Sequence, residues 1–454
     1  MHDNYEPDQL MALVQERKFR ALREILTEMN EVDIAEFLDE LEVDQELLVF
    51  RLLPKALAAE VFSYLEEDQE KLIAALSDKE LREVLDELYL DDTVDLIEDL
   101  PANLVSRILR NTEASTRSQI NQLLNYPKDS AGSLMTTEFV YLHPNNTVEE
   151  SFARIRKVGL DKETVYTCYV TANRVLQGVV TVRRLLMSAY ETKISEIMET
   201  NVLSVTTHED KEDVAQMFSK YDLTALPVVD GEDRLVGIIT VDDAMDVMEE
   251  EATEDFEKMA AILPSDKPYL RTGVFETWKA RIPWLMLLML SATFTGLIIT
   301  GFESALAACV ILTSFIPMLS GTGGNSGSQS SVAIIRALSL GEVEFSDVLA
   351  VVWKEVRVAL LCGVCLGGAN FGKMLLVDRM LMHNPDVTVA VAGVVCLTLV
   401  LTVVCAKIVG CLLPMAAEKV GIDPAVMAAP FITTIVDALS LLIYFSIATR
   451  MLSL

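Results

Sequence analysis

Three long stretches of the sequence contain no charged residue, and they constrain the fold more than any other feature. They are residues 282–302, 304–335 and 387–406. About 20 consecutive apolar residues are enough for a helix to cross the hydrocarbon core of a bilayer. The sequence therefore predicts an all-α membrane domain with five transmembrane helices. We expect these helices at about 282–302, 305–335, 347–372, 387–416 and 424–450.

The remainder of the chain is strongly acidic. The sequence has 37 Lys and Arg against 68 Asp and Glu, and 8 of these bases and 10 of these acids lie after residue 281. Residues 1–281 therefore carry 29 bases and 58 acids, a net charge of −29. Nucleic-acid binding needs a basic surface, so we exclude that class and expect metal cations as partners. The acidic segment 1–7 lacks the apolar core of a signal peptide, so we expect this front to stay cytoplasmic.

Residues 1–130 have the pattern of short amphipathic helices, with an internal repeat. The tetrapeptide Leu-Asp-Glu-Leu at 38–41 recurs at 85–88, and Leu-Pro at 53–54 recurs at 100–101. Both pairs are 47 residues apart. A period of this length is typical of stacked helix pairs. We therefore expect an acidic, α-superhelical N-terminal domain over residues 1–130.

Residues 131–248 contain short β-rich runs that alternate with helical stretches. Gly-Val-Val-Thr at 178–181 and Gly-Ile-Ile-Thr at 237–240 are 59 residues apart, which indicates a second tandem repeat. The runs at 226–230 and 237–243 resemble the CBS domain, a small α/β module that packs in pairs. The resemblance implies one CBS domain over 131–191 and a second over 192–248.

The segment that follows predicts a connecting helix with one acidic face, which we place at 249–270. Like charges three or four residues apart oppose helix formation by about a few tenths of a kcal/mol per pair. We therefore expect a cation to neutralise this face, and a merely solvated acidic face is the alternative. The acids on the face are Asp243, Asp246, Glu250, Glu254 and Glu257.

One acid lies in the last apolar run. Asp437 is the fourteenth of the 26 residues from Pro424 to Thr449, which places it near the middle of the bilayer. A carboxylate there costs roughly 2.5–3.5 kcal/mol on insertion scales. Lys407 is the only base in the other spans that could lie at a similar depth. We interpret Asp437 as a residue that lines a pore, and a structural ion pair is the alternative.

A glycine-rich run, Ser320–Gln329, interrupts another apolar stretch. Irregular backbone within a membrane occurs only where it is buried or lines a wet cavity, and its carbonyl groups can then face an ion. We expect such backbone here. Close helix packing is the alternative, and it explains the glycines but not Asn325 and Gln329. A carboxylate with carbonyl oxygens suits a hard divalent cation, and magnesium retains its waters. Composition does not separate magnesium from calcium or manganese.

The chain as a whole resembles the MgtE-type magnesium channel/transporter family. The order of an acidic helical domain, a CBS pair, a plug helix and five membrane helices carries the resemblance. It also rests on the runs Glu251–Asp255, Gly301–Ser304, Gly321–Gln329 and Leu441–Tyr444. It implies a multi-pass homodimer in the inner cell membrane, with the membrane domain over 271–454. Its pore forms between two copies, takes up Mg²⁺ and is closed by cytoplasmic Mg²⁺.

The same resemblance implies roles for single residues. Asp437 matches the selectivity acid of the pore. Residues around the hydrated ion are Gly321, Gly324, Ser328, Ala429 and Thr433, where Ser328 replaces an Asn of the family, and Pro317, Asn325 and Gln329 complete the pore motif. Cytosolic magnesium sensing is implied for Glu60, Asp91, Asp95, Gly132, Asp210, Glu212, Asp222, Asp243, Glu254 and Asp255.

ATP regulation does not carry over in the same way. CBS nucleotide sites commonly hold the ribose with an acid after the Gly-x-x-Thr strand. The first copy has Arg183-Arg184 there, whereas the second has Asp242, which is the candidate nucleotide contact. The membrane spans contain no acid–base pair, nucleophile motif or metal triad, so we expect no enzyme. The rival functions are a non-conducting magnesium-sensing regulatory protein and a transporter of Mn²⁺, Co²⁺ or Ca²⁺.

Overall fold

The computed structural model describes residues 7–65, 69–265, 269–270, 272–427 and 429–453. The chain divides into two compact units, residues 1–248 and residues 249–454. Each unit is described by itself.

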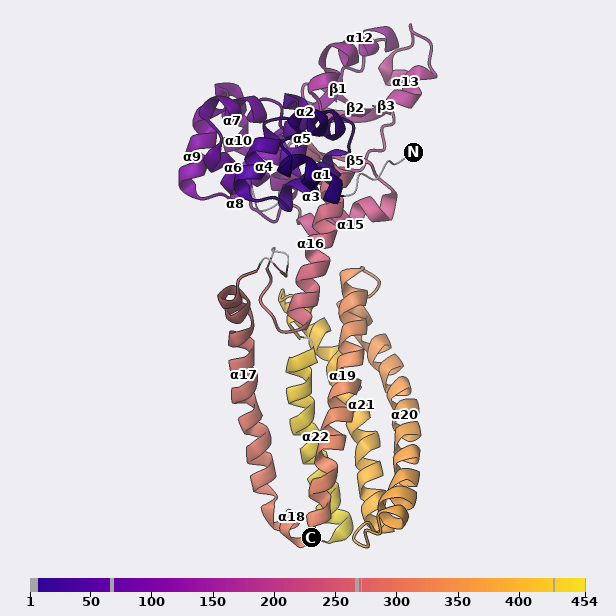
Figure 1. Ribbon diagram of the computed structural model, residues 1–454. Helices are drawn as coiled ribbons and strands as arrows, with labels where there is room; N and C mark the ends of the chain where they lie inside the picture. Colours follow the sequence, from indigo (N-terminus) through magenta and orange to yellow (C-terminus); the bar gives the residue numbers. More distant parts are fainter. Residues whose placement is uncertain (1–6, 66–68, 266–268, 271, 428, 454) are drawn as a thin grey trace. The chain divides into compact units, whose positions relative to one another are not determined.

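The first unit begins with ten short helices (Figure 1). Helices α3 (Glu31–Asp39), α5 (Lys55–Ser63), α7 (Asp78–Leu85) and α9 (Ala102–Asn111) contact one another in succession. The others are α1 (Pro7–Gln15), α2 (Phe19–Leu26), α4 (Val43–Phe50), α6 (Gln69–Ala75), α8 (Leu90–Asp99) and α10 (Ala114–Leu123).

The 47-residue repeat is present in this stack. Helices α3, α4 and α5 begin 47 residues before α7, α8 and α9. Pro54 and Pro101 occupy the N-cap positions of α5 and α9, where the missing N–H costs nothing. Leu38 and Leu85, which correspond in the two copies, are both buried in the core. The sequence repeat is thus a repeat of three helices.

Two small mixed sheets follow. In the first, β1 (Phe139–Leu142) is parallel to β2 (Thr164–Ala172), and β2 is antiparallel to β3 (Val175–Thr181). The second repeats this order with β4 (Val205–Thr206), β5 (Ala225–Val229) and β6 (Leu235–Thr240). The helices are α11 (Ala131–Leu134), α12 (Val148–Val158), α13 (Val182–Leu186), α14 (Ile194–Ile197) and α15 (Lys211–Tyr221), with a 3₁₀ turn at Gly159–Asp161.

Helix α16 (Val241–Met259) starts directly after β6. It begins earlier than expected and ends eleven residues before the predicted limit of 270. The reason is local, because Ala261 has a left-handed φ of 55° and the Ile262 amide turns back to the carbonyl of Glu257. The predicted acidic face therefore lies on one regular helix that is shorter at its end.

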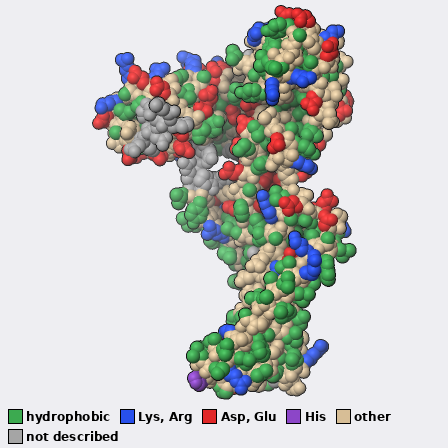
Figure 2. Space-filling view, turned by 90° about the vertical axis from the view of Figure 1, so that its right-hand side faces the viewer, with side chains coloured by type: hydrophobic (Ala, Val, Ile, Leu, Met, Phe, Trp, Pro, Cys, Tyr) green, Lys and Arg blue, Asp and Glu red, His purple; other side chains and the backbone are tan. Residues whose placement is uncertain are grey.

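The second unit is a set of long helices that run side by side (Figure 1). Among the described residues, three stretches are long and apolar enough to cross a membrane: Val274–Gly301, Val389–Val420 and Pro424–Leu452. The first two are α17 and α21, and the third comprises the 3₁₀ helix Pro424–Met427 and α22 (Ala429–Leu452). Helices α19 (Ile316–Ser339) and α20 (Val348–Lys373) are of similar length and pack on α21. Figure 2 shows hydrophobic side chains over much of this unit's surface.

The span predicted at 305–335 is not one helix. It contains α18 (Glu303–Ala308), a non-helical Cys309, a 3₁₀ helix at Val310–Phe315 and then α19. The glycine-rich run lies wholly within α19, so the expectation of irregular backbone at Ser320–Gln329 is wrong. The irregular segment lies about ten residues earlier. A further 3₁₀ turn at Phe345–Asp347 precedes α20, and a π-helix at Met374–Leu381 follows it.

Candidate functional site: an ion pathway and acidic clusters

Close helix packing explains why the glycine-rich run is helical. A Cβ on Gly324 would lie 2.9 Å from Cγ2 of Thr433, and a Cβ on Gly327 would lie 2.9 Å from Cγ2 of Ile432. On the other side of α19, Gly410 of α21 faces the carbonyl oxygen of Gly327. Glycine thus lets three helix backbones approach one another. The packing alternative is correct for these glycines, whereas Gly321 has open space beside it.

Asp437 is half-buried at the contact between α19 and α22. The Ser320 side chain of α19 lies beside its carboxylate. Thr433 lies one helical turn before it, and its hydroxyl donates to the carbonyl of Pro430 at 2.9 Å. Ala429 shares this side of α22 by position, but its side chain lies outside the described part. No base lies within ion-pair distance of Asp437 among the described residues.

The polar residues of the pore motif form a separate face of α19. Gly321, Asn325 and Gln329 are spaced by four residues and are exposed, and Ser328 beside them is half-buried. Pro317 is exposed in the first turn of the same helix. Within the described part of the chain, the amides of Asn325 and Gln329 have no hydrogen-bond partner. None of these described side chains forms a hydrogen bond with Asp437.

The charge of Lys407 is paired with an acid other than Asp437. Its ammonium group is buried and donates to Ser330 Oγ at 3.0 Å, and it lies 3.5 Å from Glu355 Oε2. Ser330 in turn donates to the same Glu355 oxygen at 2.5 Å. Ser330 is ten residues after Ser320 on α19, about 15 Å along the helix axis. Lys407 is thus at a different depth from Asp437, and the ion-pair alternative for Asp437 finds no partner in it.

The second half of α16 packs against the membrane helices of its own unit. Lys258 pairs with Glu254 and lies 2.6 Å from a carboxylate oxygen of Asp423. Asp255 accepts a hydrogen bond from Ser339 Oγ at 3.1 Å. Burial raises the pKa of Asp255; the bond from Ser339 lowers it and the charge of Asp423 raises it further, so the net shift is upward. Met259 packs on Ile335 and Ala425. Asp255 thus meets α19, and Lys258, which Glu254 pairs with, meets the α21–α22 connection. Sequence reasoning missed both contacts.

Five acids of the first unit form what we call the cytosolic acidic cluster. They are Asp91, Asp92 and Asp95 of α8, Asp243 of α16, and Glu163, which precedes β2. Burial and the charge of Asp92 raise the pKa of Asp91 to about 7. Burial and the charge of Asp91 likewise raise the pKa of Asp243 to about 7, against a hydrogen bond of 2.6 Å from Thr240 Oγ1.

The other members of the cluster are shifted in the same direction. The Asp95 side chain is exposed, yet the protein around it and the charge of Asp243 raise its pKa to about 8. Burial and nearby acids raise the pKa of Asp92 to about 6 and that of Glu163 to about 9. The Oε2 atom of Glu163 is buried and has no hydrogen-bond partner among the described residues. Sequence reasoning found Asp91, Asp95 and Asp243 but missed the other two.

The donor set of this cluster fits a hard divalent cation. All five groups are carboxylates, and no described base lies within ion-pair distance of them. No three acids, His or Cys of the described residues converge closely enough to hold a metal ion by themselves. Magnesium commonly keeps several waters and takes one or two carboxylates, so it does not require three of these groups to converge.

The remaining predicted sensing residues are scattered. Asp210 caps α15 by accepting from the Glu212 amide at 2.9 Å, and Asp222 ends the same helix with a left-handed φ of 51°. They are twelve positions apart, about 18 Å along the helix axis, so they cannot share one ion within this chain. Gly132 is needed for packing, because a Cβ there would lie 2.6 Å from the Tyr126 ring. Glu60 is exposed on α5.

The residues considered for nucleotide binding are all exposed. Arg183 and Arg184 lie on α13, where Thr181 Oγ1 accepts from the Arg184 amide. Asp242 lies in the first turn of α16.

Comparison with known proteins assigns the chain to a family. The model of the MgtE family, described as a divalent cation transporter, matches residues 316–447. The MgtE intracellular N domain matches 29–129, and the CBS domain matches 131–191 and 194–250. The magnesium transporter MgtE of Thermus thermophilus is 40% identical over 449 residues, which is 98% of each chain. The chain belongs to the MgtE family. The Bacillus subtilis magnesium transporter MgtE is 32% identical over 97% of this chain and 96% of its own.

Solved structures agree with this assignment. The cytosolic domain of the Mg²⁺ channel MgtE in complex with ATP is 41% identical, with a TM-score of 0.51, over 53% of this chain and all of that one. The soluble part of a magnesium transporter is 30% identical, with a TM-score of 0.51, over 54% of this chain and 98% of that one. This MgtE protein is thus a membrane protein of a non-enzymatic transporter family.

Proposed function

We propose that this MgtE protein is a homodimeric channel that admits magnesium, and that cytoplasmic magnesium closes it. The relatives that match over nearly the full length are named magnesium transporters. The observation that carries the proposal is the carboxylate of Asp437, which lies in an apolar helix without a base beside it. A charge in that setting is expected to face a cation or a water-filled path.

The chemistry of the Asp437 region favours a hydrated ion. One carboxylate and the hydroxyls of Ser320 and Thr433 can bind the outer waters of an ion, but they cannot replace its full shell. Magnesium dehydrates reluctantly and tolerates this kind of contact better than calcium, which takes six to eight oxygen ligands directly. The ion is therefore the cargo, and the helix contributes a negative charge and hydroxyl groups along its path.

The exposed face of α19 supports the homodimer. Asn325 and Gln329 present amides that are without partners in the described chain. Lipid offers no hydrogen bonds, so amides at membrane depth need protein or water beside them. A second copy placed against this face would supply both, with the ion path between the copies. Light scattering of the detergent-solubilised protein should give the mass of two chains.

The gate is argued from the acids of α16. Asp243 belongs to the cytosolic acidic cluster, Asp255 contacts Ser339 of α19, and Glu254 pairs with Lys258, which also pairs with Asp423. Burial is the largest cause of the raised pKa values in the cluster, and the charges of neighbouring carboxylates add to it, so ionised carboxylates here repel one another when no divalent cation is bound. Divalent cations that bridge them would make the closed arrangement favourable. A change from mostly open to mostly closed needs about 5.5 kcal/mol of differential binding, which several weak sites can supply together.

Conduction is tested with Asp437→Ala in proteoliposomes that contain a magnesium-sensitive dye. We expect loss of magnesium uptake or of its selectivity over calcium and manganese. The matched control is Asp386→Ala, which removes one exposed acid from the same unit and should leave uptake unchanged. Wild-type uptake and ion preference in Asp437→Ala would refute the pore assignment. Absence of flux in the wild type would favour the rival sensor that conducts nothing.

Closure is tested by patch clamp with a variant in which Asp243, Glu254 and Asp255 are changed to the corresponding amides. This variant should stay open at cytoplasmic magnesium concentrations that close the wild type. Closure at the wild-type concentration and with the wild-type steepness would mean that the acids of α16 are only solvated.

A further inference from the structure

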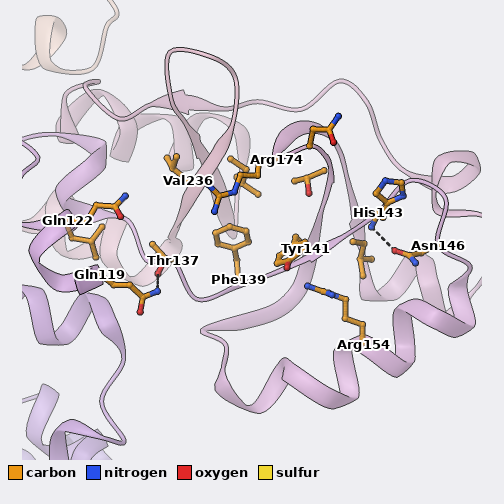
Figure 3. A pocket seen from close by; sticks show the side chains of 15 residues that line it. Gln119, Gln122, Thr137, Phe139, Tyr141, His143, Asn146, Arg154, Arg174 and Val236 are labelled. Atoms are coloured by element: carbon orange, nitrogen blue, oxygen red, sulfur yellow. Dashed lines mark hydrogen bonds between the residues drawn. The ribbon is translucent and has the colours of Figure 1, made fainter. Parts of the chain in front are cut away.

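A pocket of about 540 Å³ lies in the first unit, where three segments far apart in sequence meet (Figure 3). Helix α10 contributes Gln119 and Gln122. The first CBS domain contributes β1, Arg154 of α12 and the β2–β3 turn, and the second contributes the start of β6 at Leu235. Pockets of 300–1,000 Å³ hold ligands of metabolite size. A ligand here would touch the N-terminal domain and both CBS domains.

The charge of this pocket is opposite to that of its surroundings. In residues 1–281, about one residue in five is acidic, so 15 residues would include about three acids. The 15 lining residues include none, whereas they include two arginines and a histidine. Glu150, four residues after the lining residue Asn146, accepts from the side-chain amide of Asn146 at 3.2 Å and from the Thr147 amide in a capping box. The Glu150 carboxylate thus accepts hydrogen bonds at the N-terminus of its own helix.

The two arginines are available to a ligand. Neither guanidinium has an ion-pair partner among the described residues. Arg154 lies over the Tyr141 ring at 4.0 Å from its centroid, and its buried Nε has no hydrogen-bond partner in the described part. Arg174 is exposed, and Figure 3 shows its side chain on the side of the pocket that carries Phe139. Guanidinium groups beside aromatic rings suit an anion with a planar ring.

The backbone of Arg174 has a left-handed conformation, which is unfavourable for an arginine. Asn173 and Arg174 form the β2–β3 turn with φ values of 52° and 70°. Such a turn favours Asn-Gly, because glycine adopts positive φ without a steric cost. The carbonyl of Arg174 accepts from the Leu235 amide at 2.9 Å, which ties the turn to the second CBS domain. An arginine therefore occupies a position at which glycine would be the easier residue.

We propose that this pocket binds a phosphate-bearing small molecule with a planar ring, of the nucleoside phosphate class. Arg154 and Arg174 would bind the phosphate oxygens, and Phe139 and Tyr141 would pack against the ring. The site is separate from Arg183, Arg184 and Asp242, the residues considered for a CBS nucleotide site, because none of them lines the pocket. The proposal does not depend on ion conduction.

The test is calorimetric titration of the full chain in nanodiscs with ADP, at one constant magnesium concentration. Arg174→Gly removes a guanidinium and restores the favoured turn residue, so a loss of binding cannot be assigned to misfolding. We expect this variant and Arg154→Gln each to raise the Kd by about tenfold or more, since a charge-assisted hydrogen bond contributes at least that much. The matched control is Arg156→Gln, because Arg156 also lies over an aromatic ring but does not line the pocket. Its Kd should equal that of the wild type.

Further arms test the class of ligand. Pyrophosphate should bind through the shared phosphate chemistry, but more weakly than ADP, and adenosine should bind far more weakly. Adenosine that binds as tightly as ADP would overturn the assignment of the arginines. The proposal is also overturned if ADP does not bind, if both pocket variants bind ADP like the wild type, or if Arg156→Gln weakens binding as much as they do.

Discussion

The replacement of Asp91 by Asn should make the contact between α8 and the CBS pair less sensitive to pH. In the wild type, burial raises the pKa of Asp91 from 3.8 to about 7. An acid with a raised pKa costs the folded arrangement free energy wherever the unfolded form would be ionised. This cost is absent below pH 4, builds between about pH 4 and pH 7, and is constant above. A shift of roughly three pKa units corresponds to about 4 kcal/mol, as an upper bound.

Asn has the shape of Asp but no charge, so Asp91→Asn should remove this cost. We expect the α8 amides of the variant, in EDTA at pH 8.5, to exchange hydrogen more slowly than those of the wild type. The free energy of local opening should be higher in the variant by up to about 4 kcal/mol. At pH 5 the difference should shrink to less than half. Saturating magnesium should protect the wild type at pH 8.5, because the cation replaces the protons.

The matched control for this experiment is Asp44→Asn. Asp44 stands 47 residues before Asp91 in the repeat and is exposed on α4. Its exchange should equal that of the wild type at both pH values. If protection of wild-type α8 in EDTA, corrected for intrinsic exchange, is the same at pH 5 and pH 8.5, carboxylate crowding does not govern this contact. The electrostatic part of the proposed gate would then be refuted.

Two further substitutions test the packing of the membrane helices. Lys407→Met leaves the largely enclosed Glu355 without its cation and should cost up to about 3–5 kcal/mol, and Glu355→Gln in the same chain should largely restore the lost stability. Thermal unfolding in detergent measures both effects. A double variant no more stable than Lys407→Met would contradict the pairing. Gly410→Ala should lower the unfolding temperature because its Cβ meets the Gly327 carbonyl, whereas Gly368→Ala, which has open space, should not. Equal stability of these two variants would contradict the close approach of α19 and α21.

Local signals in the sequence predicted much of the fold. The 47-residue repeat is visible because equivalent helices use the same starting residues, such as Pro54 and Pro101, and those requirements are local. The apolar runs predicted the long helices for the same reason, since insertion in lipid depends on the composition of each segment. The tandem sheets followed from strand runs that recur at a fixed spacing. Each of these features is decided within about 20 residues.

The parts that sequence reasoning missed depend on distant pairs. Glu355 and Lys407 are 52 residues apart and meet only because α20 and α21 pack together. Glu163 and Asp92 join the cytosolic acidic cluster from different domains. The glycine-rich run had two meanings in the sequence, and the neighbours that choose between them, Thr433 and Gly410, lie about 100 residues away. The residues of α19 themselves do not indicate that these neighbours pack against them.

Lys407 and Asp437 show what the three-dimensional arrangement adds. In the sequence both are single charges in apolar runs, and each could neutralise the other. In the structure, the ammonium group of Lys407 is paired with Glu355 and Ser330. Ser330 lies about 15 Å along α19 from Ser320, which is at the level of Asp437. A neutralised charge can be retained for packing alone, whereas an acid without a base needs a cation or water. The same insertion cost therefore supports a structural role for Lys407 and an ion-pathway role for Asp437.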